Sequence, residues 1–241
     1  MSARSGCYHP SIVRELQTTV LAKGQKPRAR SESLANNEER KANSEHLARR
    51  DDVSAFILAG GRSSRMGADK ALLPYGEKNL LQRTLQTVSA IAETTYIVGP
   101  RERYAEFGNV IEDIYPGSGP LGGIHAALQG TGTDLNLILS VDMPLMTTAF
   151  LSWLTERART AQEVIVVPDA AGGLQPLCAI YRPSVREAAE RVLRNGDYKI
   201  GHLFSQVPTR IITEQEIVAS GFSTNIFQNI NTPEEYQTCR Q

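Results

Sequence analysis

The order of apolar and polar residues from position 53 onward predicts strands that alternate with helices. Apolar runs of strand length occupy residues 53–58, 94–98, 110–111, 135–140, 163–168, 174–181 and 208–213. Helical spacing of apolar residues, or cap residues, predict helices within residues 80–91, 121–129, 183–195, 198–205 and 233–238. Such alternation favours parallel strands joined by right-handed crossovers. We therefore expect one three-layer α/β domain, with a mostly parallel twisted sheet and helices on both faces.

Residues 1–50 have a different pattern. Residues 11–23 carry apolar side chains at roughly helical spacing, but residues 26–50 are rich in Arg, Glu, Asn and Ser and poor in large apolar groups. Such a segment buries too little surface to order itself. We predict a disordered N-terminal extension over residues 1–50 and a folded domain over 51–241. The alternatives are a partner-docking helix, an over-extended start codon and an organelle-targeting segment, the last weakened by five glutamates.

Composition and charge narrow the class of protein. The hydrophobic content of 41% suffices for a core, and a formal net charge of zero gives no global reason to expect nucleic acid or an anionic membrane as partner. Residues 1–50 hold ten Lys and Arg against five Glu, leaving sixteen basic against twenty-one acidic residues elsewhere. No apolar run approaches the ~20 residues of a membrane helix. Cys7, Cys178 and Cys239 form no metal or disulfide pattern, so we expect reduced thiols in a cytoplasmic protein.

The segment after the first predicted strand has the composition of a phosphate-binding loop. Gly60 and Gly61 end the apolar run, and Arg62, Arg65 and Lys70 follow in a glycine-containing turn. Glycines let the main chain approach a ligand closely, and three cations within nine residues repel one another unless an anion lies among them. We expect main-chain N–H groups and these cations to bind a polyphosphate. The alternative is an ordinary mobile surface turn between a strand and a helix.

Two better-known phosphate loops do not match this segment. The dinucleotide fingerprint requires Gly-x-Gly-x-x-Gly, and the P-loop requires four residues between its first glycine and Gly-Lys-Ser/Thr. Here five residues separate Gly61 from Gly67, and Lys70 has no Ser or Thr after it. The segment would therefore be a phosphate loop of another kind.

Two aspartates follow predicted strands. Asp142 comes after the apolar residues 137–141, at the end of a central strand, where an unpaired carboxylate is unfavourable. Mg²⁺ would satisfy it, because this ion usually takes one or two protein carboxylates and fills its other positions with water and substrate phosphates. The alternative is that Asp142 caps the following helix. Asp113 ends the run that begins at Val110, and it could instead begin the turn that contains Pro116.

Glycine and asparagine residues supply two further candidate contacts. The block that begins with Gly119, Pro120 and Leu121 leads from a loop into a predicted helix, and such a start could receive an anion or let a nucleoside pack closely. A glycine-rich turn without a ligand would have the same sequence. Asn229 and Asn231 alternate with an isoleucine, so in an extended strand both amides point to one side. Amide oxygens are hard ligands that suit a metal ion. The alternative for Asn231 is a capping role beside Thr232 and Pro233.

Five sequence blocks occur in order between residues 53 and 241. They are Leu58-Ala59-Gly60-Gly61-x-Ser-x-Arg65-Met66-Gly67-x-Asp69-Lys70, Glu112-Asp113, Gly119-Pro120-Leu121-Gly122-Gly123-Ile124, Val141-Asp142-Met143-Pro144 and Asn229-Ile230-Asn231-Thr232-Pro233-Glu234-Glu235. In sequence and order these blocks resemble the molybdenum cofactor guanylyltransferases. The resemblance implies a Rossmann-like nucleotidyltransferase fold. One departure lies at residues 76–79, where relatives often show Gly-Lys-Pro, and it puts contacts in that loop in doubt.

The resemblance also implies an activity and a set of site residues. The activity is transfer of GMP from GTP to the terminal phosphate of molybdenum-molybdopterin, with Mg²⁺ as cofactor and pyrophosphate as leaving group. The implied catalytic residues are Arg65, Lys70 and Asp142, and the implied metal ligands are Asp142 and Asn231. The residues implied to bind GTP are Leu58, Ala59, Gly60, Gly61, Lys70, Asp113 and Asp142. Those implied to face the nucleotide or the pterin are Gly119, Pro120, Leu121, Gln175, Asn229 and Asn231.

Other functions remain open from the sequence. A cytidylyltransferase acting on the same pterin, or a sugar-phosphate nucleotidyltransferase, could use the same fold, because main-chain groups near residues 58–60 could bind guanine or cytosine. A nucleotide-binding accessory protein that delivers the cofactor without catalysis is an alternative of another class. For the guanylyltransferase that the resemblance implies, the expected partners are molybdoenzymes or their chaperones and other proteins of molybdenum cofactor biosynthesis.

Overall fold

The computed structural model describes residues 52–60, 69–232 and 235–237. The predicted extension over residues 1–50 lies outside the described residues, as do Gly61, Arg62 and Arg65, and these expectations stay predictions. Cys178 is the one described cysteine; its thiol is free and buried, and burial raises its pKa. In the described ranges, no helix combines the length and the apolar character needed to cross a membrane.

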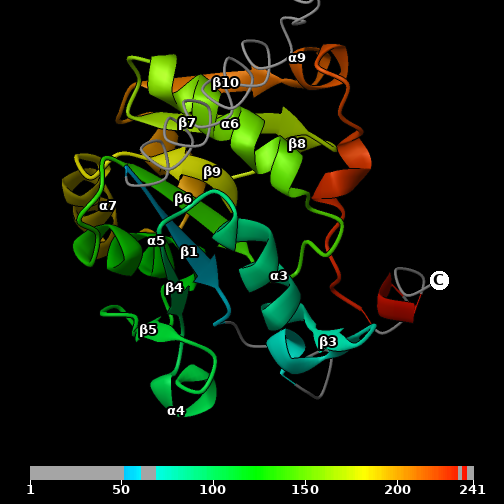
Figure 1. The fold of residues 1–241 in the computed structure, drawn as a ribbon. Coiled ribbons are helices and arrows are strands. Elements are labelled where there is room, and N and C mark those ends of the chain that lie inside the picture. The colour runs from blue at the N-terminus through cyan, green and yellow to red at the C-terminus, as the bar shows by residue number, and fades with distance from the viewer. Residues whose placement is uncertain (1–51, 61–68, 233–234, 238–241) are drawn as a thin grey trace, which may run out of the picture. The chain divides into compact units, whose positions relative to one another are not determined.

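An eight-stranded sheet organises the described residues (Figure 1). The strands are β1 Val53–Leu58, β4 Thr94–Val98, β5 Asn109–Ile111, β6 Leu135–Ser140, β7 Ile165–Ala170, β8 Gly173–Leu174, β9 Cys178–Tyr181 and β10 Thr209–Thr213. Their order is β10-β7-β9-β6-β1-β4-β5, with β8 paired to β7. β9 runs antiparallel to both β6 and β7, and β8 runs antiparallel to β7, whereas the other pairs are parallel. The mostly parallel sheet predicted from the sequence is confirmed.

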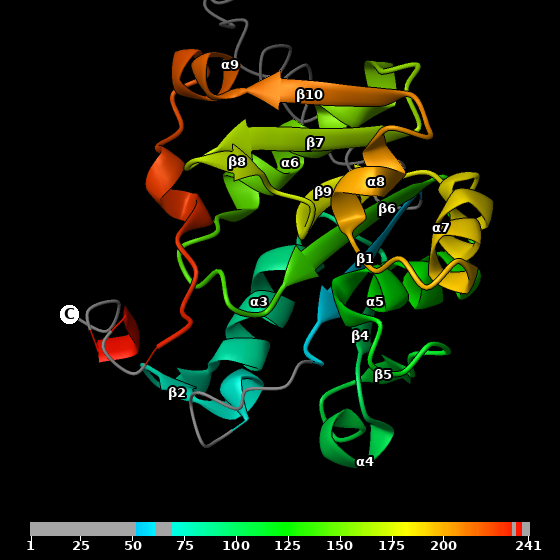
Figure 2. The same ribbon diagram turned by 180° about the vertical axis from the view of Figure 1, so that it is seen from behind.

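Helices cover both faces of this sheet (Figures 1 and 2). α3 Leu80–Ser89 and α6 Thr148–Thr160 lie on one face, and α5 Gly119–Gln129, α7 Val185–Arg194 and α8 Ile200–Phe204 lie on the other. Strand β1 shows why both faces need cover: all six of its residues are buried. Val53, Ala55 and Ile57 belong to the core beneath α3 and α6, while Phe56 and Leu58 belong to the core beneath α5 and α7. Side chains that alternate between two apolar layers explain the continuous apolar run.

Several elements were not predicted from the sequence. They are α4 Arg101–Tyr104, α6, α9 Glu214–Ala219, the 3-10 helices η2 Lys70–Leu72 and η3 Thr224–Phe227, and a hairpin of β2 Pro74–Tyr75 and β3 Lys78–Asn79. The sequence does contain an indication of helix α6. Thr147 is a residue type common at helix N-caps, and its side chain accepts a hydrogen bond from the Phe150 amide. The hairpin occupies the segment that departs from the family pattern, and Gly76 makes its turn with a φ of 65°.

Residues 174–181 form two short strands and not the single strand that we predicted. β8 ends at Leu174 and β9 begins at Cys178. Pro176 lies between them and has no N–H to donate to a ladder, which explains the interruption. The last predicted helix is described only at Glu235–Gln237, which is helical.

The strand order reverses beside β1. The chain passes from β1 to β4 and β5 on one side, and then returns to β6 on the other side. The carbonyl of Leu58 accepts a hydrogen bond of 3.2 Å from the amide of Val141 at this point, which holds the ends of β1 and β6 together. Ligands of open α/β sheets bind beyond the carboxyl ends of the strands at such a reversal. The fold therefore places the candidate site after Leu58 and Ser140.

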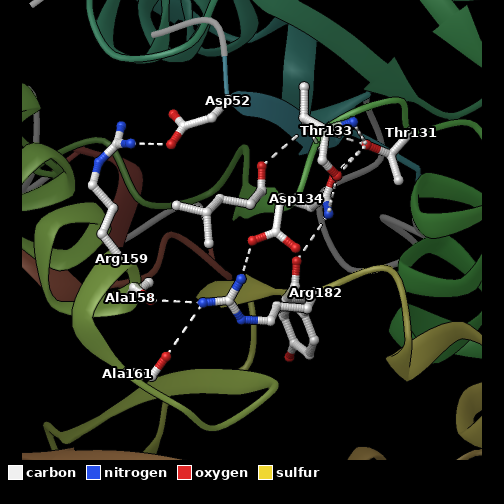
Figure 3. A network of polar contacts seen from close by, with 11 residues as sticks. Asp52, Thr131, Thr133, Asp134, Ala158, Arg159, Ala161 and Arg182 are labelled. Atoms are coloured by element: carbon white, nitrogen blue, oxygen red, sulfur yellow. Dashed lines mark hydrogen bonds and ion pairs between the residues drawn. The ribbon is translucent and has the colours of Figure 1, made fainter. Parts of the chain in front are cut away.

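A polar network lies at the opposite end of the strands from the candidate site, where β1 and β6 begin (Figure 3). Arg159 near the end of α6 forms an ion pair with Asp52, immediately before β1. Asn136, which is fully buried in β6, donates a hydrogen bond of 2.9 Å to the carbonyl of Tyr181 and accepts one from Thr131. These contacts satisfy buried polar groups far from the strand ends that carry the site.

Arg182 joins three groups in this network. It forms an ion pair with Asp134, and its Nη2 donates to the carbonyls of Ala158 at 3.2 Å and Ala161 at 3.3 Å (Figure 3). These carbonyls belong to the last turn of α6 and to the residue after it. Carbonyls at a helix C-terminus have no N–H donor within the helix. A guanidinium there also interacts favourably with the helix dipole.

We expect Arg182→Ala to lower the free energy of unfolding by about 2 kcal/mol, because it removes charge-assisted hydrogen bonds to two carbonyls. Asp134→Ala should lower it by less than about 1 kcal/mol, because the Asp134 side chain is 64% exposed. Urea unfolding of both variants measures the difference. If both variants lost the same free energy of unfolding, Arg182 would contribute through its ion pair with Asp134 and not through the carbonyls at the end of α6.

Candidate functional site

One lysine connects three segments of the chain at the carboxyl end of the sheet. The Nζ of Lys70 lies 3.2 Å from Oδ2 of Asp142 and 3.1 Å from Oδ1 of Asn231. The Lys70 and Asp142 side chains are 16% and 20% exposed, so this ion pair is largely shielded from water. Residues predicted separately to bind phosphate and metal therefore meet at one point.

Main-chain contacts fix each member of this trio, which we call the Lys70 cluster. Asp142 follows β6, and its carbonyl accepts a hydrogen bond of 2.9 Å from the amide of Ile230. This bond brings the segment that carries Asn231 alongside Asp142. Glu235 Oε2 accepts hydrogen bonds from the amides of Asn231 at 2.5 Å and of the next residue at 3.0 Å. The Asn231 side chain is thereby left free to bond Lys70.

The helix-cap alternative for Asp142 is not what the structure shows. Helix α6 begins at Thr148 and is capped by Thr147, several residues beyond Asp142. The capping role at the other segment belongs to Thr232, whose Oγ1 accepts from the amide of Glu235 at 3.2 Å. Asp142 and Asn231 therefore direct their side-chain oxygens to Lys70 and cap no helix.

Tyr104 holds the two ends of the phosphate-loop segment. Its hydroxyl oxygen lies 3.1 Å from the carbonyl of Ala59, before that segment, and 2.9 and 3.0 Å from the carboxylate oxygens of Asp69, after it. Its side chain is buried, and burial together with the Asp69 carboxylate raises the pKa of Tyr104, so the hydroxyl stays a donor. Asp69 also caps η2 by accepting a hydrogen bond of 3.1 Å from Ala71 N–H. Since Lys70 is the first residue of η2, Tyr104 indirectly positions it.

Asp113 lies at a second place, beyond the end of β5. Its Oδ1 accepts a hydrogen bond of 2.8 Å from the amide of Tyr115, so the turn role considered from the sequence is present. The carboxylate packs against the first turns of α5, where a Cβ added at Gly122 would lie 2.7 Å from Oδ2. Burial raises the pKa of Asp113, while the Tyr115 N–H and the nearby His125 oppose that shift. Gly122 therefore makes the room that this carboxylate occupies.

A pocket of about 740 Å³ opens beside Asp113. Its lining residues come from the ends of β1 and β4, from the segment after β5 and from the start of α5; they are Leu58, Gly60, Val98, Gly99, Pro100, Glu102, Glu112, Asp113, Pro116, Gly117, Gly119, Pro120 and Gly123. Leu58 and Val98 provide apolar walls, and the glycines expose main chain. The charged side chains among these lining residues are all carboxylates. Among the described residues, this pocket, the acidic pocket below, therefore offers apolar walls and carboxylate acceptors to a ring system that carries donor groups.

Several residues predicted to contact the nucleotide or the pterin have partners within the protein. The amides of Ala59 and Gly60 both donate to the carbonyl of Val98 at 3.1 Å, so these two donors are already engaged by the protein. Leu121 is fully buried in the core beneath α5. Gln175 donates through Nε2 to the carbonyl of Ala170 at 2.8 Å, which ties it to the β7–β8 turn.

The two asparagines do not lie in an extended strand. No strand is assigned between residues 228 and 232, and the two amides have different surroundings. Asn231 bonds Lys70, whereas Oδ1 of Asn229 is buried with no hydrogen-bond donor among the described residues. The prediction that both amides share one side has no support in this arrangement.

The donor set at Asp142 and Asn231 fits Mg²⁺. It comprises one carboxylate and one amide oxygen, and Mg²⁺ typically uses one or two protein carboxylates together with water and phosphate oxygens. A zinc site would need three or four protein ligands. Within the described ranges, no group of three or more His, Cys, Asp or Glu side chains could hold a metal. Asp142 and Asn231 could therefore hold Mg²⁺ only together with ligands from water or from a substrate.

The sequence analysis missed Tyr104 as a site residue. It stands in a turn of charged residues, Arg101 to Arg103, and is almost fully buried while those three are exposed. A single aromatic residue after three charged residues indicates that its side chain packs into the protein interior. Its partners could not be read from the sequence, because Asp69 and Ala59 lie 35 and 45 residues away.

We expect Tyr104→Phe to lower kcat for nucleotidyl transfer by about tenfold, because one charge-assisted hydrogen bond is lost and Lys70 is less well placed. The ring remains to fill the core, so the thermal unfolding midpoint should change little. Tyr96→Phe is the matched control: it removes a hydroxyl from the neighbouring strand, and its ring stacks on Phe56 at 5.1 Å. Equal kcat values for the two variants would contradict the positioning role of Tyr104.

We expect Gly122→Ala to raise KM for the nucleotide by about tenfold, because the new methyl group would displace the Asp113 carboxylate. Alanine is favoured over glycine in a helix by about 1 kcal/mol, so lost helix stability would not explain the effect. Gly132→Ala is the control, since a Cβ there meets nothing within 4 Å. Steady-state kinetics of both variants test the expectation, and an unchanged KM in Gly122→Ala would contradict it.

Comparison with known proteins places this arrangement in a family. The model of the MobA-like NTP transferase domain matches residues 55–211. A protein of Clostridium perfringens named "Probable molybdenum cofactor guanylyltransferase" is 36% identical over 188 residues, which cover 76% of this chain and 94% of that protein. A protein of the same name from Carboxydothermus hydrogenoformans is 33% identical over 188 residues, covering 77% and 94%.

A solved structure agrees with these sequence matches. Molybdopterin-guanine dinucleotide biosynthesis protein A from Archaeoglobus fulgidus superposes with a TM-score of 0.69 and 25% identity, covering 78% of this chain and 96% of that one. The similarity thus extends over nearly the whole length of each of these proteins. Four of the five motif blocks lie within residues 55–211, which the family model matches, and the block that begins at Asn229 lies beyond them. This chain is a nucleotidyltransferase and belongs to the molybdenum cofactor guanylyltransferase family, with a MobA-like NTP transferase domain.

Proposed function

We propose that this chain transfers GMP from GTP to the terminal phosphate of molybdenum-molybdopterin, giving molybdopterin guanine dinucleotide and pyrophosphate. Family membership supports the reaction class. The observation that carries the assignment to this site is the Lys70 cluster, in which an ammonium, a carboxylate and an amide oxygen converge at the reversal of strand order. In the reaction, an acceptor phosphate oxygen bonds the α-phosphorus of GTP and the bond to the β-phosphate oxygen breaks.

Charge separates the two halves of the proposed nucleotide site. The acidic pocket carries Glu102, Glu112 and Asp113, which would repel a triphosphate but can accept hydrogen bonds from ribose hydroxyls and from base N–H groups. Lys70 lies outside the lining of that pocket, at the segment that follows Gly60. The nucleoside would therefore occupy the pocket, and the phosphates would extend along the loop segment toward Lys70.

The residues of the Lys70 cluster would act mainly through position and charge. Lys70 would neutralise negative charge on the leaving pyrophosphate, and Arg65 would assist from the loop segment. Asp142 and Asn231 would hold Mg²⁺, which when bound supplies charge neutralisation and alignment of phosphate oxygens. The attacking phosphate is already an anion, so no side chain needs to remove a proton. Alignment of two mutually repelling anions would be the main contribution of the protein.

Guanine is favoured over cytosine by the chemistry of the acidic pocket. Guanine offers two adjacent donors, N1–H and the N2 amino group, and a carboxylate can accept from both, whereas cytosine offers one amino group. Glu102 and Glu112 are the lining carboxylates that could accept in this way, in addition to Asp113. A cytidylyl or sugar-phosphate nucleotidyltransferase on the same fold remains the alternative within the class.

The physiological partners follow from the proposed reaction. GTP and molybdenum-molybdopterin would be the substrates, and molybdoenzymes or their chaperones would receive the product in the cytoplasm. A delivery protein that binds nucleotide and pterin without catalysis is the alternative of another class. Such a protein would have no need of the Asp142 carboxylate, which gives a direct test.

We expect Asp142→Asn to lower turnover by about 100-fold or more, with GTP binding largely kept, because the carboxylate acts on charge that develops during transfer. The assay is mass spectrometry of the dinucleotide product formed from GTP and molybdenum-molybdopterin with Mg²⁺. Asp134→Asn is the matched control, since this aspartate lies before β6, at the opposite edge of the sheet. Normal turnover in Asp142→Asn would overturn the metal assignment. Product formed from CTP in preference to GTP would favour the cytidylyl alternative.

A further inference from the structure

The oxygens proposed to bind the metal already have a cation beside them. Oδ2 of Asp142 and Oδ1 of Asn231 are the two acceptors of the Lys70 ammonium, at 3.2 and 3.1 Å. An ammonium and Mg²⁺ would share these two acceptors, and two cations a few ångströms apart repel each other strongly. A free metal at these oxygens is therefore disfavoured while Lys70 keeps this arrangement.

Hydrogen bonds hold the backbone around Lys70, whereas its ammonium is carried on a flexible four-carbon stem. Asp69 caps η2, and the carbonyl of Lys70 accepts a hydrogen bond of 3.1 Å from Leu73 N–H. The carboxylate of Asp69 does not offer Lys70 an easy second partner, because it is engaged by Tyr104, by Ala71 N–H and, at 3.4 Å, by Arg103. Lys70 would need a new anionic partner to leave Asp142, and a triphosphate supplies one.

We propose that Lys70 acts as an internal counter-ion that excludes free divalent metal from Asp142 and Asn231 until a nucleotide arrives. The nucleotide phosphates draw the ammonium away from the carboxylate, and the vacated oxygens accept the metal that the same phosphates coordinate. Metal and nucleotide binding are thereby coupled through one side chain. This inference rests on the proposed function for the identity of the metal ligands, and it adds an order of binding: free metal binds weakly, and metal with nucleotide binds tightly.

The proposal predicts opposite effects of one substitution on two measurements. We expect Lys70→Met to bind free Mn²⁺ about tenfold more tightly than the unmodified chain does, because the competing charge is gone. The same variant should bind the Mn²⁺ complex of α,β-methylene GTP about tenfold more weakly, because Lys70 then has phosphate as its partner. Lys70→Arg, which keeps the charge, should not gain affinity for free Mn²⁺. A residue with a merely structural role would not produce gains and losses of opposite sign.

The experiment is a titration of the full chain with Mn²⁺, followed by the electron paramagnetic resonance signal of the free ion, with and without the analogue. Thermal unfolding of each variant shows that it is folded. A Lys70→Met variant whose affinity for free Mn²⁺ equals or falls below that of the unmodified chain overturns the counter-ion proposal. A double variant, Lys70→Met with Asp142→Asn, distinguishes failure of the counter-ion proposal from failure of the proposed function. If the double variant still binds Mn²⁺ tightly, the ion is not bound at Asp142. The proposed assignment of Asp142 as a metal ligand then fails.

Discussion

The site depends on a single ammonium that joins distant parts of the chain. Lys70 reaches a carboxylate 72 residues later and an amide 161 residues later, so the cluster exists only when the sheet and the C-terminal segment are in place. The bond between Leu58 and Val141 sets the separation of the two central strand ends, and the bond between Ile230 and Asp142 adds the third segment. The reactive centre is therefore complete only when the sheet and the C-terminal segment have come together.

Negative charge is distributed so that the two parts of a nucleotide would be distinguished. One carboxylate, Asp142, is paired with Lys70, while Glu102, Glu112 and Asp113 line the acidic pocket, whose lining among the described residues includes no cation; Glu112 is paired with Arg101, at 3.9 Å, outside that lining. A ligand with a polar, uncharged head and an anionic tail has only one favourable orientation in such a field.

The sequence predicted the parts of the fold that are governed by local pattern. β1 was recognisable because all six of its residues are apolar or small and buried, and the order of the motif blocks placed Lys70, Asp142 and Asn231 in one family site. The split between β8 and β9 was missed because an apolar run hides the effect of Pro176 on hydrogen bonding. Helix α6 was missed even though Thr147 caps it. Tyr104 could not be assigned, because its role depends on which distant oxygens the fold brings to its hydroxyl.

The position of Asn231 after the last strand has a consequence for incomplete chains. Every strand ends by Thr213, and the buried hydrophobic residues of the described region end at Ile230. Early termination just beyond Ile230 would thus yield a polypeptide that retains the sheet and the acidic pocket but lacks an oxygen of the reactive centre. Such a product would lose the Asn231 contact to Lys70 and also the packing of Tyr236 against the core, so an intact sheet alone would not complete the Lys70 cluster.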